Sequence, residues 1–188
     1  ALDAACIRPV QEGYFPGAVQ TGNTVGDVPG QTIGNITENQ QGLSGQGVLV
    51  GIVDSGVDWQ HPDFCNKDGT SRILRLWDQS LLAKPGEDPP EGYAAGVEYT
   101  KTDIDRALRL SGAEGKQIVR EQDFSGHGTS VLGIAAGNGR ASGGVNRGAA
   151  YTSDIIAVKM GMPGENSFPR TAELMQGVDY LVRQAAEL

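Results

Sequence analysis

The alternation of hydrophobic and polar positions predicts an α/β arrangement from about residue 45 onward. Residues 49–53 form a continuous apolar run, which is typical of a central parallel strand covered on both faces. Residues 154–160 predict a second buried strand, and residues 72–78 and 96–100 favour two more. Between these segments, other stretches have the periodicity of helices. We therefore expect strands and helices to follow one another along the chain.

Three segments predict helices. Residues 129–136 are apolar and suit a short buried helix, and residues 102–110 suit a second helix with Thr102 and Asp105 as a weak capping box. The third segment, residues 171–188, has an amphipathic pattern, so we expect it to pack against the core by one apolar face. That face contains Leu174, Val178, Leu181, Val182 and Ala185.

Asp54 directly follows the first predicted strand. In open α/β sheets, ligands bind at the carboxyl ends of the strands, so a carboxylate at this point faces a potential site. Ser55 and Gly56 then allow a tight turn. A simpler interpretation is that Asp54 only caps this turn, as aspartate often does after strands.

His127 lies at the opening of the predicted 129–136 helix. Gly126 and Gly128 flank it and leave the imidazole little steric cover, so it can reach outward from a buried helix. A lone histidine is more often a satisfied core or surface residue. The Asp54 segment precedes the His127 segment along the chain, and the two segments together are a far more specific signal than either residue alone.

Residues 50–58 and 123–133 together resemble the Asp and His motifs of the subtilisin-like serine peptidases. The resemblance covers roughly residues 42–188 and implies a three-layer subtilisin-like α/β fold with a mostly parallel central sheet. It also implies that Asp54 orients and stabilises the imidazole, while His127 acts as general base and then general acid toward a serine. Such an enzyme hydrolyses peptide bonds in protein or peptide substrates.

The serine of the triad is missing from the expected context. The family's Gly-Thr-Ser tripeptide occurs twice, ending at Ser71 and at Ser130, but neither copy has the small Ala and Pro continuation. No convincing oxyanion asparagine follows residue 160 either. We therefore interpret the chain as the amino-terminal half of a catalytic domain, truncated before the serine-bearing half and inactive alone. The alternatives are a catalytically inactive relative that binds or regulates, and an unrelated α/β binding domain.

The chain divides into two parts. Residues 1–44 are rich in Gly, Gln, Asn and Thr and predict an arm or connecting segment. Residues 45–188 form the partial peptidase domain, with an insertion expected at about 66–122. Within that insertion, residues 68–79 and 103–108 resemble the spore-germination subtilases. Because truncation would remove the next strand of the sheet, we expect self-association through the exposed sheet edge.

Calcium is the only cofactor that the resemblance suggests. Asp63 matches a family position that ligates calcium, but one hard oxygen ligand is far from a site. The family's calcium loop should fall near residues 138–146, where this chain has no carboxylate and carries Arg140. Calcium is therefore allowed by the sequence but not expected.

Net charge, the length of the apolar runs and the number of cysteines limit which classes of protein remain. The net charge of −8 argues against nucleic-acid binding, and no apolar run approaches membrane-spanning length. Cys6 and Cys65 are the only cysteines, and they form either one disulfide or two structural thiols. We recognise no signal-peptide pattern in these residues and expect none in this chain. By resemblance, we still expect the parent protein to be secreted, cell-surface or spore-associated.

Overall fold

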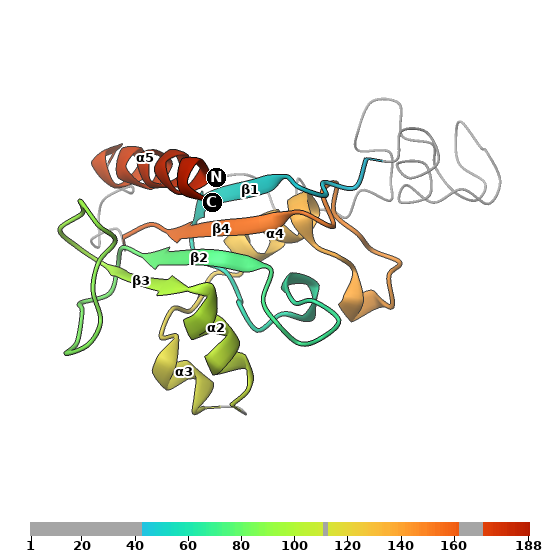
Figure 1. Cartoon of the computed structure of the whole chain (residues 1–188), viewed down its shortest axis with the longest axis horizontal. Helices are drawn as coiled ribbons and strands as arrows, with labels where there is room; N and C mark the ends of the chain where they lie inside the picture. The colour runs from blue at the N-terminus through green and yellow to red at the C-terminus, as the bar shows by residue number, and fades with distance from the viewer. Residues whose placement is uncertain (1–42, 111–112, 162–170) are drawn as a thin grey trace.

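The computed structural model describes residues 43–110, 113–161 and 171–188. Its centre is a four-stranded sheet with the order β1-β4-β2-β3. The strands are β1 (Leu49–Asp54), β2 (Ile73–Asp78), β3 (Val97–Thr100) and β4 (Asp154–Lys159). β4 pairs in parallel with both β1 and β2, whereas β3 is antiparallel to β2 (Figure 1). The predicted α/β fold with a mostly parallel sheet is confirmed.

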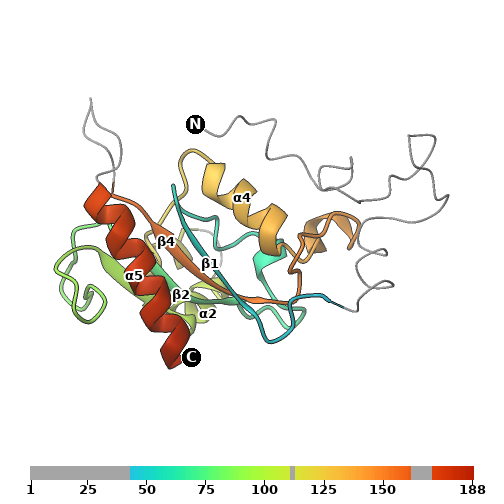
Figure 2. The same ribbon diagram turned by 90° about the horizontal axis from the view of Figure 1, so that it is seen from above.

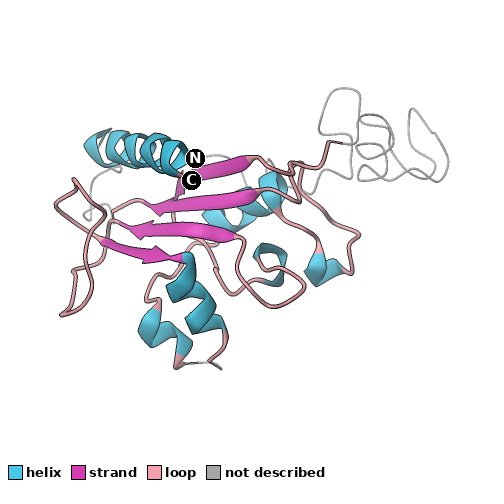
Figure 3. Ribbon diagram, in the orientation of Figure 1, coloured by secondary structure: helices cyan, strands magenta, loops and turns pink. Residues whose placement is uncertain are grey.

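Helices cover both faces of this sheet. Helix α5 (Thr171–Glu187) lies across β1 and β4 on one face, and α4 (His127–Ala136) packs against β1 on the other (Figure 2). The second face also carries α2 (Lys101–Leu108) and α3 (Gly115–Ile118), and two short 3-10 helices, η3 (Pro62–Phe64) and η4 (Arg140–Ser142), lie in the loops (Figure 3). The described residues thus form three layers, as the sequence predicted.

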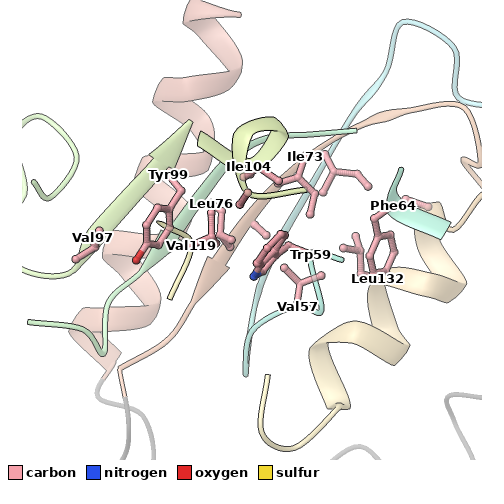
Figure 4. Close-up of a cluster of buried hydrophobic side chains, with 14 residues drawn as sticks. Val57, Trp59, Phe64, Ile73, Leu76, Val97, Tyr99, Ile104, Val119 and Leu132 are labelled. Atoms are coloured by element: carbon pink, nitrogen blue, oxygen red, sulfur yellow. The ribbon is translucent and has the colours of Figure 1, made fainter. Parts of the chain in front are cut away.

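Alternation along the strands divides the core in two. On β4, Ile155 and Ala157 join the cluster beneath α2 and α4, whereas Ile156 and Val158 join Tyr180 of α5 on the opposite face. The larger cluster is shown in Figure 4, which labels residues from the strands, the helices and the loops between them. Residues 66–122, where we expect an insertion, contribute to that cluster through Ile73, Leu76, Val97, Tyr99, Ile104, Ala107 and Val119.

The position of β1 differs from the prediction. Its apolar run is indeed covered on both faces, since Val50 and Ile52 pack on one cluster and Leu49 and Val53 on the other. However, β1 is an edge strand and not a central one, because among the described residues only β4 pairs with it. The apolar residues of a strand indicate that its two faces are buried. They do not indicate how many neighbouring strands pair with its backbone.

The predicted packing face of α5 is wrong for most of its members. Leu174, Val178 and Val182 are 44%, 50% and 65% exposed, and the helix instead buries Gly177 and Tyr180. A Cβ on Gly177 would lie 2.8 Å from Val53 Cγ1, so the glycine allows α5 to approach β1 closely. The face of α5 that contacts the sheet therefore contains a glycine and a tyrosine, and the periodicity of aliphatic residues does not predict this face.

The N-cap of helix α2 lies two residues earlier than predicted. Its capping box pairs Thr100 with Asp103 and not Thr102 with Asp105. Asp105 instead accepts a hydrogen bond from the backbone N–H of Ser71, which connects α2 to the start of β2. The predicted arm, residues 1–44, lies almost wholly outside the described residues, as does Cys6. Cys65 is a buried free thiol, 3.6 Å from the carbonyl oxygen of His61.

Candidate active site

Three parallel strands bring charged residues to one edge of the sheet. In the strand register, Asp54 of β1 lies opposite Lys159 of β4, and Lys159 lies opposite Asp78 of β2. All three residues end their strands. The carboxyl ends of parallel strands form the usual ligand-binding edge of an α/β sheet. The fold therefore places Asp54 where the sequence analysis expected a site.

Helix α4 delivers His127 to the same edge. His127 is the first residue of the helix, after Gly126, whose φ of 71° is the left-handed conformation that glycine accepts without strain. A Cβ on Gly128 would lie 2.1 Å from the carbonyl oxygen of Gly56 and 3.1 Å from Asp54 Cβ. Gly128 thus permits the helix to approach the end of β1 far more closely than any other residue would.

Asp54 and His127 are in direct contact. Nδ1 of His127 lies 2.7 Å from Oδ1 of Asp54, and the same oxygen accepts a hydrogen bond from the backbone N–H of Ser55. The side chain of His127 is 32% exposed and that of Asp54 is 19% exposed, so the pair lies at the surface but is partly shielded from water. An ionised carboxylate only accepts hydrogen bonds, so Nδ1 carries the proton and Nε2 of a neutral imidazole has a free lone pair. Such an imidazole can accept a proton at Nε2.

Sequence reasoning missed the residues that hold this pair together. Asp123 accepts hydrogen bonds from Ser55, Gly126 and Thr129, and therefore connects the segment after β1 to the first turn of α4. A partial signal was present in the sequence, because aspartate and serine side chains often accept the free N–H groups at the start of a helix and both residue types occur just before α4.

A buried acid lies behind the loop that follows Asp54. Glu121 is 1% exposed, and its Oε1 accepts a hydrogen bond from the backbone N–H of Val57 at 3.1 Å. Burial raises the pKa of Glu121 to about 8, with a further increase from Asp78, while the hydrogen bond from Val57 and the charge of Lys159 act in the opposite direction. Glu121 is therefore mostly protonated at neutral pH, beside the turn that carries Asp54.

Neither Gly-Thr-Ser copy places a serine at the imidazole. Ser71 is fully buried and its hydroxyl accepts from the backbone N–H of Ile73. The Ser130 hydroxyl donates to the carbonyl oxygen of Gly126, one turn back in α4. Within residues 43–110, 113–161 and 171–188, no serine hydroxyl is hydrogen-bonded to Nε2 of His127.

The surroundings of Asp63 do not fit a bound calcium ion. Its Oδ1 accepts the backbone N–H of Ala141 at 2.7 Å, and its carbonyl oxygen accepts that of Asn138. The Arg140 guanidinium donates to the carbonyl oxygens of Cys65 and Asn66, so a cationic side chain already uses the neighbouring oxygens. In the described part of the chain, no group of three or more His, Cys, Asp or Glu side chains could hold a metal.

The sequence of residues 45–188 matches the model of the subtilase family. The chain belongs to the subtilase family. Subtilases with similar sequences include subtilisin-like protease SBT2.4 of Arabidopsis thaliana, which is 29% identical over 173 residues. The major intracellular serine protease of Bacillus subtilis is 24% identical over 148 residues. These alignments cover 82% and 79% of this chain, but only 21% and 34% of the two proteins.

A solved protease structure shows the same fold. The CspB protease of Clostridium perfringens superimposes with a TM-score of 0.65 at 36% sequence identity, over 80% of this chain and 28% of that one. The chain therefore spans about a fifth to a third of the length of these relatives. Among the described residues of this subtilase sequence, no helix has the length and apolar character needed to cross a membrane.

Proposed function

We propose that this chain supplies the aspartate and histidine of an Asp–His–Ser triad in a subtilisin-like serine endopeptidase. The supporting observation is the 2.7 Å contact between Asp54 Oδ1 and His127 Nδ1 at the carboxyl edge of a parallel sheet. Because the chain spans only part of its relatives and no described serine is bonded to Nε2, the nucleophile belongs to a segment of the parent protein outside this sequence. Protein or peptide chains are the proposed substrates.

In this role the imidazole carries one proton in each half of the reaction, first that of the serine and then that of the attacking water. His127 Nε2 takes the proton of the serine hydroxyl as its oxygen attacks the scissile carbonyl carbon, and the positive imidazolium is stabilised by Asp54. The same proton then passes to the leaving amine as the C–N bond breaks. Attack of water on the acyl-enzyme repeats the sequence and returns the serine. Asp54 stays ionised throughout and keeps Nδ1 as the donor.

The test compares the two histidines of the chain in the full-length parent. His127→Ala should lower kcat/KM on a peptide substrate by at least about a hundredfold, because general acid–base catalysis contributes at least that much. His61→Ala is the matched control, since His61 Nδ1 accepts the backbone N–H of Asp63 and takes no part in the pair. Equal activity of the two variants would refute the role of His127.

The isolated chain should be inactive. It should hydrolyse no peptide and take up no fluorophosphonate probe, because neither Ser71 nor Ser130 contacts the imidazole. Labelling of either serine would show that the nucleophile is within this chain. If the parent itself lacks turnover and carries another residue in place of the serine, it is a catalytically inactive relative that binds or regulates.

A further inference from the structure

Asp123 is bonded to both segments that meet at the catalytic pair. Its Oδ1 accepts the Ser55 hydroxyl at 2.8 Å and the backbone N–H of Gly126 at 3.0 Å. Its Oδ2 accepts the backbone N–H of Thr129 at 2.9 Å and the Thr129 hydroxyl at 2.7 Å. Ser55 directly follows Asp54, and Thr129 is two residues beyond His127. One carboxylate therefore joins the neighbours of both predicted catalytic residues.

The two hydroxyls extend this connection in opposite directions. The oxygen of Ser55 also accepts the backbone N–H of Gly128 in α4, and the oxygen of Thr129 accepts that of Asp58 in the loop after β1. Each hydroxyl has a single proton, and a carboxylate only accepts. Asp123 thus draws both protons toward itself and leaves the hydroxyl oxygens as acceptors for backbone on the opposite segment.

The same residue compensates for a helix start without a capping side chain. Gly126 is the N-cap of α4 and has no side chain to accept the free N–H groups of the first turn. Asp123 accepts the third of these groups, Ser55 accepts the second, and the Ser125 hydroxyl accepts that of His127. Burial raises the pKa of Asp123, but the hydrogen bonds from Thr129, Ser55 and Gly126 outweigh it and the net pKa is lowered. The group is therefore an anion at the positive end of the helix.

We infer that Asp123 is a positioning residue, which fixes the start of α4 against the end of β1 and so sets the contact between His127 Nδ1 and Asp54 Oδ1. This inference rests on the proposed catalytic role of the pair. The positioning role requires a carboxylate on a side chain of the length of aspartate, because a negative charge alone would not orient the hydroxyls of Ser55 and Thr129. Asp123→Asn keeps the shape but places an amide N–H against a donor, and Asp123→Glu keeps the charge but moves the oxygens.

The experiment records proton NMR spectra of the isolated chain at low temperature. A hydrogen bond from imidazole Nδ1 to a carboxylate gives a downfield proton signal, and with two histidines in the chain His127→Ala identifies it. Asp54→Asn should abolish this signal. Asp123→Asn and Asp123→Glu should both weaken or abolish it while circular dichroism shows a folded chain. Asp88→Asn, which changes an exposed carboxylate in the loop between β2 and β3, should leave it unchanged.

The outcomes separate the two proposals. If the wild-type chain has no signal that depends on Asp54, the proposed pair is refuted and the positioning role falls with it. If the pair is present and both Asp123 variants keep it, even with a lower melting temperature, Asp123 is only a structural cap and the inference is wrong. A signal lost in Asp123→Asn but retained in Asp123→Glu would also overturn it, in favour of charge alone. Should the Asp123 variants unfold, Ser55→Ala removes one arm of the connection and must weaken the same signal.

Discussion

Replacement of Glu121 by glutamine should change the pH dependence of stability in a defined direction. Glu121 is almost fully buried, and its Oε2 has no hydrogen-bond partner among the described residues. Its neighbours include Asp78 at the end of β2, Lys159 at the end of β4 and Asp123 in its own segment. Burial raises the pKa of this carboxyl from 4.5 to about 8. Glutamine has the same shape and keeps an oxygen for the Val57 N–H, but it carries no titrating proton.

The size of the effect follows from the difference in bound protons. Between about pH 4.5 and about pH 8, the folded chain keeps a proton on Glu121 that the unfolded chain has lost. The contribution of protonated Glu121 to the free energy of unfolding is therefore full below about pH 4.5, and it is lost as the pH rises to about 8. The slope is at most about 1.4 kcal/mol per pH unit, so the free energy of unfolding loses about 4–5 kcal/mol across the window. Glu121→Gln removes that loss.

Urea unfolding at a series of pH values between about 3 and about 9 measures this difference. The wild-type chain should lose stability relative to Glu121→Gln as the pH rises, and the two curves should run parallel below about pH 4. Glu91→Gln is the matched control, because Glu91 is exposed and the same chemical change there should leave the wild-type curve almost unaltered. Parallel curves for wild type and Glu121→Gln over the whole range would refute the buried, protonated acid.

Three further predictions concern the packing of α4, the buried Arg72 and the association of the chain. Gly128→Ala should destabilise the chain by about 1–3 kcal/mol, because its Cβ would meet Gly56, whereas Gly133→Ala in the same helix meets nothing within 4 Å and should stabilise by up to about 1 kcal/mol. Urea unfolding of both variants checks this contrast, and equal values would contradict it. Arg72→Met should cost about 3–5 kcal/mol in the same assay, since the buried guanidinium donates to the carbonyl oxygens of Ser153, Ala136 and Asp63, and a loss below about 1 kcal/mol would contradict that account. Through the edge of β1 that no other described strand pairs with, and through the exposed apolar side chains of α5, the isolated chain should pair with a second copy. Light scattering coupled to size exclusion should give masses above the monomer that rise with concentration, and a constant monomeric mass would rule this out.

Local sequence was sufficient to predict the four strands, the helices α2, α4 and α5, and the chemistry at the ends of β1 and α4, whereas the short helices α3, η3 and η4 were not predicted. The apolar run before Asp54 predicted β1 and its coverage on both faces, because each face needs apolar side chains wherever it is buried. The apolar segment after His127 predicted α4 for the same reason. The resemblance carried by the two motifs predicted that Asp54 and His127 meet, and the carboxyl ends of the strands are where such a site is expected.

Tertiary structure decided the features that depend on pairs of distant segments. The edge position of β1 is a matter of backbone pairing, and α5 packs through Gly177 and Tyr180 because close approach to β1 requires a small residue there. The role of Asp123 depends on hydroxyls at Ser55 and Thr129, which come together only when α4 docks on β1. The raised pKa of Glu121 has the same origin, because burial is a property of the folded chain. Side-chain periodicity records which residues avoid water, but a hydrogen-bond partner many residues away leaves no periodic trace in the sequence.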